Sequence, residues 1–234
     1  MIILFGLAGS GKGTQSKALS EIYGWRWIST GELIRANGNF NHIIADGNMI
    51  SDEDVTSLLA RELDKTDAEG YDVILDGYPR TKAQAEWLAS REGDKLYGAI
   101  ILDVSKEELY NRLYMRAGLD GRVDDQEKSS IERRFALYEE NIAAILPVLE
   151  ARGIPVVHVD GTGDPGEVTD RLCAVVETMD PGAIEQQDDV NGEEIWLLHT
   201  GAGRCDPHRY ALRGHPRQTR RDAGLAARPA SGPA

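Results

Sequence analysis

The sequence predicts an α/β protein built on a parallel β-sheet with helices on both faces. Short and almost wholly apolar runs alternate with segments of helical spacing over about the first 180 residues. Strands that are apolar throughout are typical of parallel sheets, which helices cover on both sides. The first run, residues 1–5, also leads directly through a glycine-rich loop into a helix. This strand–loop–helix unit is the usual beginning of such a sheet.

Each expected element is a run bounded by glycine, proline or a capping residue. The expected strands are residues 1–5, 25–29, 72–76, 97–104 and 154–160. The expected helices are residues 15–22, 30–35, 52–64, 82–90, a segment after Ser105, 127–151 and 165–178. Thr30, Asp52 and Ser105 are the expected N-caps, with Glu108 completing a capping box, and Pro147 is expected to kink the long helix.

Length, charge and cysteine content limit the classes of protein. The 234 residues suit one domain with an appendage, and the net charge of −13 argues against nucleic acid or an acidic membrane as the main partner. Cys173 and Cys205 form no CxxC pair, so we expect no disulfide framework, no zinc site and a cytoplasmic location. No apolar run reaches the length of a membrane span, and a strand at residue 1 leaves no room for a signal peptide.

Composition changes beyond residue 180. An acidic, polar stretch is followed by a segment rich in Arg, Gly, Pro and Ala, which holds seven Arg, two Asp and no Lys from Trp196 onward. Neither helical nor strand periodicity is present there. We therefore expect a domain over residues 1–180 and a polar linker with an Arg-rich, disordered tail over residues 181–234.

The glycine-rich loop has the spacing of a phosphate-binding loop. Gly6 is followed after four residues by Gly11 and Lys12, and Gly13 stands where a hydroxyl residue is usual. Glycine lets backbone N–H groups approach an anion, the helix N-terminus adds partial positive charge, and the lysine adds a full one. The loop therefore predicts binding of nucleotide phosphates.

Other chemistry-bearing residues follow the ends of the expected strands, where ligands bind in folds of this kind. They are Thr30 with Arg35 and Asp76 with Arg80; helices and a loop elsewhere add Arg112, Arg116, Arg122, Arg134, Asp124 and Asp125. A guanidinium group binds phosphate oxygens bidentately, through two parallel hydrogen bonds. This number of arginines around a phosphate loop therefore predicts two phosphate-bearing ligands and phosphoryl transfer between them. Asp76 is expected to help hold Mg²⁺ through water. Considered alone, Arg112 and Arg116 could equally be a solvated surface pair, and Asp124–Asp125 a helix N-cap.

Residues 1–180 resemble the adenylate kinases, nucleoside monophosphate kinases of the short-lid type. The resemblance rests on separated motifs in order: Gly9-Ser10-Gly11-Lys12-Gly13-Thr14-Gln15, Ser29-Thr30-Gly31-Glu32-Leu33-Ile34-Arg35, Asp76-Gly77-Tyr78-Pro79-Arg80-Thr81 with Gln84-Ala85, Arg112 with Arg116, Gly121-Arg122-Val123-Asp124-Asp125, and Arg134. The Gly13-Thr14 ending of the loop is the form that this family uses. The resemblance implies a P-loop, three-layer α/β/α fold with a five-stranded parallel sheet, a small AMP-binding segment and a short lid.

The resemblance also implies site residues for ATP + AMP ⇌ 2 ADP, a reaction that requires Mg²⁺ and no zinc. ATP would contact Gly9, Ser10, Gly11, Lys12, Gly13, Thr14, Arg112, Arg116 and Gly163. AMP would contact Thr30, Arg35, Asn48, Met49, Ile50, Gly77, Tyr78, Pro79, Arg80, Gln84, Arg122 and Arg134. The catalytic set would be Lys12, Arg80, Arg116, Arg122 and Arg134. Partners would be these nucleotides alone, with a monomeric protein and neither nucleic acid nor membrane.

Departures from the family pattern leave alternatives. The AMP-binding segment, residues 30–52, is short between Ala36 and Gly47, and the lid, residues 117–126, has no cysteines. Thr30 and Gln84 are the pair typical of members that select adenylate, which favours AMP over the pyrimidine monophosphates. A UMP or CMP kinase, or a nucleotide-binding module with impaired turnover, are the alternative functions.

Overall fold

A five-stranded parallel sheet forms the centre of the protein in a computed structural model, which describes residues 1–38, 50–120, 128–179, 187–188 and 194–195. The strands are β1 (Ile2–Gly6), β2 (Arg26–Ser29), β3 (Val73–Asp76), β4 (Gly98–Asp103) and β5 (Val156–Asp160). Their order is β2-β3-β1-β4-β5, and every neighbouring pair is parallel. The predicted fold class is confirmed.

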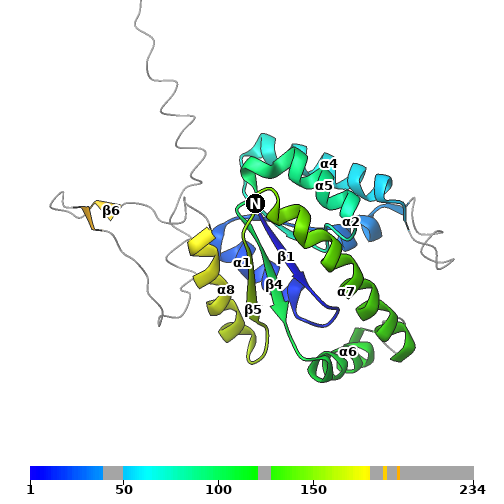
Figure 1. Cartoon of the computed structure of the whole chain (residues 1–234). Helices are drawn as coiled ribbons and strands as arrows, with labels where there is room; N and C mark the ends of the chain where they lie inside the picture. The colour runs from blue at the N-terminus through cyan, green and yellow to red at the C-terminus, as the bar shows by residue number, and fades with distance from the viewer. Residues whose placement is uncertain (39–49, 121–127, 180–186, 189–193, 196–234) are drawn as a thin grey trace, which may run out of the picture.

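Helices connect consecutive strands and cover both faces of the sheet (Figure 1). They are α1 (Lys12–Tyr23), α2 (Thr30–Ala36), α4 (Asp52–Glu69), α5 (Lys82–Glu92), α6 (Lys106–Asp120), α7 (Lys128–Glu150) and α8 (Pro165–Met179), with a 3-10 turn η2 (Gly93–Lys95) before β4. Among the described residues, no helix is both long and apolar enough to cross a membrane.

The two faces of the sheet bury separate apolar clusters, because side chains alternate along each strand. Ile3 and Phe5 of β1 pack in the cluster that α4, α5 and α7 complete. Ile2 and Leu4 pack in the opposite cluster, which α1 and α8 complete. A third cluster, centred on Leu113, joins α6 to α7 next to the glycine-rich loop. The central strand β1 is therefore buried on both faces, and its carboxyl end leads into the glycine-rich loop.

Helix boundaries differ from expectation in several places. Helix α4 runs to Glu69 rather than stopping near residue 64, and α6 continues to Asp120, within the expected lid of residues 117–126. Ser51 rather than Asp52 is the N-cap of α4, since its hydroxyl accepts from Asp54 N at 3.1 Å. Ser29 precedes α2 as its N-cap residue, so the prediction for Thr30 was wrong. At both N-termini, the side chain that was expected to cap the helix, Thr30 or Asp52, has a hydrogen-bond partner elsewhere in the fold.

The prediction for Ser105 is confirmed. Its hydroxyl accepts from Glu108 N at 3.3 Å, as an N-cap should, although Glu108 turns to Arg112 instead of closing a capping box. Pro147 lies inside α7, and the kink expected there stays a prediction. Cys173, buried on α8, is disulfide-bonded, which the spacing of the two cysteines gave no reason to expect; its partner lies outside the described residues.

Residues 181–234 are described only at β6 (Gln187–Asp188) and β7 (Glu194–Ile195), an antiparallel pair. The expected linker and tail otherwise lie outside the described residues, as do the middle of the AMP-binding segment and most of the lid.

Candidate active site

The glycine-rich loop connects β1 to α1 and arranges itself around Lys12. Gly11 takes a left-handed conformation with φ 94° at the N-cap of α1, where the absence of a Cβ removes the steric penalty. The Lys12 ammonium donates to Gly6 O at 2.6 Å and to Leu7 O at 2.9 Å, which folds the side chain back over the loop. The loop, the start of α1 and the lysine thus surround one small volume at the end of β1.

Asp76 brings a carboxylate to the same volume. It is the last residue of β3, in register with Leu4 of β1 and Ser29 of β2. Its Oδ2 lies 3.8 Å from the position that a Cβ on Gly13 would occupy, so the acid faces the beginning of α1. Parallel strand order alone therefore delivers the acid to the phosphate loop, as the sequence predicted.

Lys12, Asp76 and Arg80 form a cluster of interacting charges, which we call the charged centre. Desolvation lowers the pKa of Lys12 to about 8; Asp76 raises it, while Arg80 and Arg116 lower it. Desolvation also raises the pKa of Asp76, an effect that Lys12 and Arg80 oppose. Arg80 borders open solvent, yet desolvation is the main cause that lowers the pKa of its guanidinium, with Arg35 acting in the same direction. Positive charge here exceeds negative charge, so the centre is suited to an anion.

Gly77 is the point where the second group of candidate residues converges. The Thr30 hydroxyl donates to Gly77 O at 2.8 Å, and Arg80 Nε donates to the same oxygen at 2.8 Å. A Cβ at Gly77 would lie 3.1 Å from both Thr30 Oγ1 and Arg80 Nη2, so the glycine makes this close approach possible. Arg35 lies one turn along α2 with its guanidinium near Gly31. The structure therefore brings Thr30, Arg35, Gly77 and Arg80 together.

Gln84 is fixed by contacts on both of its polar atoms. Its Oε1 accepts from Arg80 N at 2.7 Å, and its Nε2 donates to Asp52 Oδ1 at 2.8 Å. The second oxygen of Asp52 accepts from Thr81 Oγ1 at 2.6 Å. The sequence singled out Gln84 but missed Asp52, because nothing in a helix N-terminus reveals a partner on another helix.

Tyr78 and Pro79, joined by a cis peptide bond, form the floor beneath this group. Tyr78 is 1% exposed, and its hydroxyl lies 3.0 Å from Thr56 Oγ1. Burial raises the pKa of Tyr78 to about 12, so the phenol is neutral at physiological pH. Its ring meets Trp87 edge-on, with ring centroids 6.1 Å apart. The described contacts of Tyr78 are those of a core residue that supports the site from behind.

Arginines from α6 and α7 approach the phosphate loop from the other side. Arg112 donates to Glu108 Oε1 at 2.9 Å and to Gly161 O at 3.2 Å, which joins α6 to the end of β5. Arg116, one turn later, is close enough to Lys12 to affect its pKa. Arg134 lies half-buried on α7. Both α6 arginines thus point inward, and the reading of Arg112 and Arg116 as a solvated surface pair is wrong.

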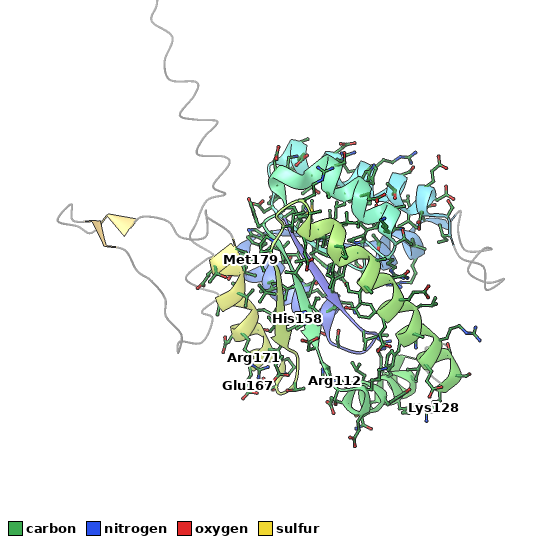
Figure 2. All side chains as sticks on the ribbon, viewed as in Figure 1. Arg112, Lys128, His158, Glu167, Arg171 and Met179 are labelled. Carbon is green, nitrogen blue, oxygen red and sulfur yellow. The ribbon has the colours of Figure 1, made fainter. Side chains whose placement is uncertain are left out.

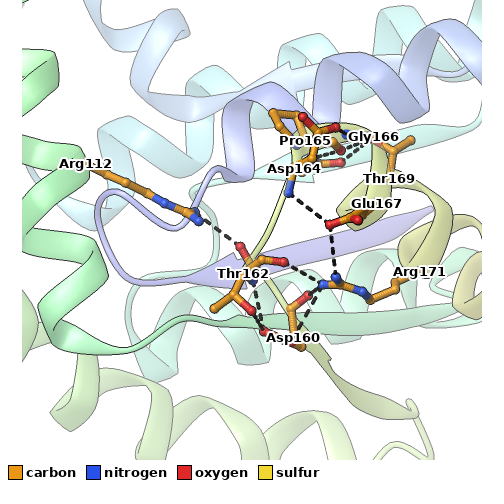
Figure 3. Close-up of polar contacts among 11 residues, drawn as sticks. Arg112, Asp160, Thr162, Asp164, Pro165, Gly166, Glu167, Thr169 and Arg171 are labelled. Atoms are coloured by element: carbon orange, nitrogen blue, oxygen red, sulfur yellow. Dashed lines mark hydrogen bonds and ion pairs between the residues drawn. The ribbon is translucent and has the colours of Figure 1, made fainter.

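The loop between β5 and α8, residues 160–165, is organised by hydrogen bonds (Figure 3). Arg171 of α8 donates to the backbone oxygens of Asp160 and Thr162, the latter at 2.8 Å. Asp160 Oδ1 accepts from Thr162 N at 2.9 Å and from Thr162 Oγ1 at 2.7 Å. Gly163 lies in this loop with φ 100°. Arg112 and Arg171, labelled in Figure 2, belong to different helices, so their contacts hold the loop from two sides (Figure 3).

Gln15 connects this loop to the phosphate loop. It follows Thr14, is 3% exposed, and donates from Nε2 to Pro165 O at 2.9 Å. Thr169 Oγ1 lies 2.7 Å from Gln15 Oε1 and 2.8 Å from Pro165 O, two acceptors that share its proton. Gln15, Thr81, Arg171 and Asp52 are the residues at this site to which the sequence analysis gave no role. Gln15 and Thr81 stood within recognised motifs, but neither motif reveals the partner of its residue.

Three of the expected site residues, Asn48, Met49 and Arg122, lie outside the described residues, as do Asp124 and Asp125. Ile50 is described and is half-buried just before Ser51. A metal-binding group of three or more His, Cys, Asp or Glu is absent from the described part of the chain. Asp76 lies beside the phosphate loop, and its expected role in holding Mg²⁺ stays a prediction.

Comparison with known proteins gives one consistent result. The protein-family model described as Adenylate kinase matches residues 4–154. The Adenylate kinase of Thermus thermophilus is 37% identical over 186 residues, which cover 75% of this chain and 96% of that protein. That of Kocuria rhizophila is 38% identical over 187 residues, covering 75% and 98%. That of Xanthomonas campestris is 37% identical over 183 residues, covering 73% and 96%.

Proposed function

This chain belongs to the adenylate kinase family of phosphotransferases, and on that premise we propose that it catalyses the reversible, Mg²⁺-dependent reaction ATP + AMP ⇌ 2 ADP. An oxygen of the AMP phosphate bonds to the γ-phosphorus of ATP, while the bond from that phosphorus to the β–γ bridging oxygen breaks. ADP leaves on one side and ADP is formed on the other. A role in keeping the adenine nucleotides in balance follows from this reaction.

The charged centre is the observation that carries the proposal. Lys12, Arg80 and Arg116 lie close enough to one another to shift the pKa of Lys12. Like charges gathered in partly desolvated positions repel one another, and an anion placed among them relieves that repulsion. Phosphoryl transfer requires this kind of charge neutralisation together with in-line placement of the two substrates.

We assign the two sides of the centre to the two nucleotides. The side formed by the loop and α6 would hold ATP through Gly9, Ser10, Gly11, Lys12, Gly13, Thr14, Arg112, Arg116 and Gly163. The side around Gly77 would hold AMP through Thr30, Arg35, Asn48, Met49, Ile50, Gly77, Tyr78, Pro79, Arg80, Gln84, Arg122 and Arg134. Support for the division comes from Arg80, which contacts Gly77 and also acts on Lys12. Arg80 thus stands between the two sides, where the transferred group would pass.

Asp76 is suited to a magnesium ion that arrives with ATP. Mg²⁺ prefers carboxylate and phosphate oxygens, keeps several waters, and seldom has a cage of protein ligands. A carboxylate beside the phosphate loop, facing the beginning of α1, fits that pattern. The bound ion would neutralise phosphate charge, and Asp76 would hold it through water.

The assay that tests the proposal measures ADP formed from MgATP and each of AMP, UMP and CMP. AMP should be the best acceptor, because Thr30 and Gln84 lie on the acceptor side. Faster turnover of UMP or CMP would make the protein another nucleoside monophosphate kinase. ATP binding without ADP formation would make it a nucleotide-binding module. A monomeric, cytoplasmic protein stays a prediction.

A further inference from the structure

A glutamine side chain distinguishes donor from acceptor on a base only when its own orientation is fixed. Rotation of the terminal amide by a half-turn exchanges the carbonyl oxygen with the NH₂ group and leaves the shape nearly unchanged. A freely rotating amide therefore pairs equally well with a base edge and with the edge of reversed polarity. Whatever fixes the rotation decides which base is accepted.

Two neighbours of unchangeable polarity fix the amide of Gln84. The backbone N–H of Arg80 can only donate, and it lies 2.7 Å from Gln84 Oε1. The Asp52 carboxylate accepts, and its Oδ1 lies 2.8 Å from Gln84 Nε2. A half-turn of the amide would place NH₂ against an N–H and oxygen against a carboxylate oxygen. Gln84 is 4% exposed, so water does not replace the contacts that such a rotation would lose.

Asp52 is itself held in position. Its Oδ2 accepts from the Thr81 hydroxyl at 2.6 Å, and that hydroxyl accepts from Gln84 N at 3.3 Å. One threonine thus begins α5 and orients the carboxylate that meets Gln84. Since Asp52 lies on α4 and Gln84 on α5, the contact depends on the packing of the two helices.

We propose that Asp52 is a positioning residue that determines base specificity by fixing the rotation of the Gln84 amide, an inference that rests on the proposed function. The amide has two N–H groups and two lone pairs, of which Asp52 and Arg80 use one each. One donor and one acceptor remain for a base. Adenine presents an acceptor at N1 and a donor at N6, whereas hypoxanthine presents a donor at N1 and an acceptor at O6. The fixed amide accepts the first pattern and rejects the second.

The experiment compares AMP with inosine monophosphate, whose bases have the same purine frame. We would measure kcat/KM for both acceptors, with MgATP as donor, in the wild-type protein, Asp52→Asn and Asp54→Asn. The asparagine at residue 52 can rotate its own amide and so removes the fixed polarity at nearly constant shape. Asp54 is the matched control, because it lies in the same first turn of α4 and contacts Ser51 instead of Gln84.

The ratio of kcat/KM for AMP to that for inosine monophosphate should fall on the order of tenfold in Asp52→Asn, because a reversed hydrogen bond costs the binding of one base only. Asp54→Asn should keep the wild-type ratio. An equal loss for both acceptors in Asp52→Asn, with the ratio unchanged, would show that Asp52 has a structural role only and would overturn the inference. Asp52→Ala, which also removes the fixed acceptor, serves if the asparagine variant does not fold.

Failure of the proposed function would give a different result from failure of the inference about Asp52. The wild-type protein would then produce no ADP from either acceptor, and calorimetric binding of AMP and inosine monophosphate to the same proteins would replace the kinetic ratio. A binding ratio that Asp52→Asn lowers supports the inference, and one that it leaves unchanged overturns it.

Discussion

The charged centre and the loop after β5 contain the same kinds of side chain but use them differently. In the charged centre, the half-buried Lys12 and Asp76 act on each other and on the exposed Arg80, and the pKa values of all three shift. In the loop, the half-buried Arg171 and the exposed Asp160 hold backbone groups by hydrogen bonds. The charges of the first region thus act on one another, whereas those of the second hold a loop in place.

The difference shows how solvent access sets the size of an effect. Removing one charge from a partly desolvated cluster changes the electrostatic interaction of every other charge there with a bound anion. Removing a hydrogen bond near water costs less, because water takes the place of the lost partner. The charged centre should therefore respond to substitution far more strongly than the loop.

The largest expected effect belongs to Arg80→Ala. We expect kcat/KM for AMP to fall about a thousandfold, because an arginine directed at a transferring phosphoryl group contributes that much. The melting temperature should change little. Arg133→Ala, an exposed arginine on α7, is the matched control. Wild-type kinetics in Arg80→Ala would show that this residue is not part of the site. They would also contradict the expectation that the charged centre responds more strongly than the loop.

The pH dependence of the charged centre gives the next largest effect. The pKa of Lys12 is about 8 in the free protein, so its ammonium loses a proton as the pH rises through that value. We expect kcat/KM for ATP to be level below that pH and to fall about tenfold per pH unit above it. Lys12→Arg, which stays charged, should lose this alkaline fall. An unchanged profile in that variant would assign the titration to another group.

Arg171→Ala tests the loop and should have a smaller effect. Two backbone oxygens of the loop would lose their donor, and the KM for ATP should rise about tenfold while kcat stays close to wild type. Arg152→Ala, an exposed arginine on the turn after α7, controls for loss of surface charge. A fall in kcat as large as that of Arg80→Ala would mean that the loop belongs functionally to the charged centre.

Thr169→Val should have the smallest effect and tests the connection between the regions. The substitution leaves Gln15 Oε1 without its donor and should lower the free energy of unfolding by about 1 kcal/mol in urea denaturation. Thr178→Val is the control, because that threonine lies on the same helix and donates only to Val175 O, at 2.7 Å. An equal loss of unfolding free energy in the two variants would show that the contact of Thr169 with Gln15 does not stabilise the connection between the two loops.

Local chemistry made most of the fold predictable from sequence. Apolar runs such as Ile2–Gly6 gave the strands, and their order along the chain gave a parallel sheet. The C-terminus of α6 was harder to predict, because Gly118 within the helix is a modest cost that the rest of the helix offsets. The position of a helix end depends on such small differences in free energy, so helix ends were the least accurate part of the predicted fold.

Contacts between distant residues were the part of the site that sequence could not provide. The motif around Lys12 identified the phosphate loop, and the ends of the strands brought Asp76 to it. The contacts of Asp52 with Gln84, 32 residues apart, and of Gln15 with Pro165, 150 residues apart, depend on how helices pack. Asp52 looked like a helix cap because that role is local and its true partner is not.

The folded-back lysine of the phosphate loop makes nucleotide binding a proton-coupled reaction. In the free protein the Lys12 ammonium has two carbonyl oxygens as partners and a pKa of about 8. Polyphosphate beside it would favour the charged form and raise that pKa, so the complex should hold more proton than the free protein. At pH 8, binding of ATP should take up roughly half a proton. Calorimetric binding enthalpies would then vary with the ionisation enthalpy of the buffer, and equal heats in all buffers would contradict the coupling.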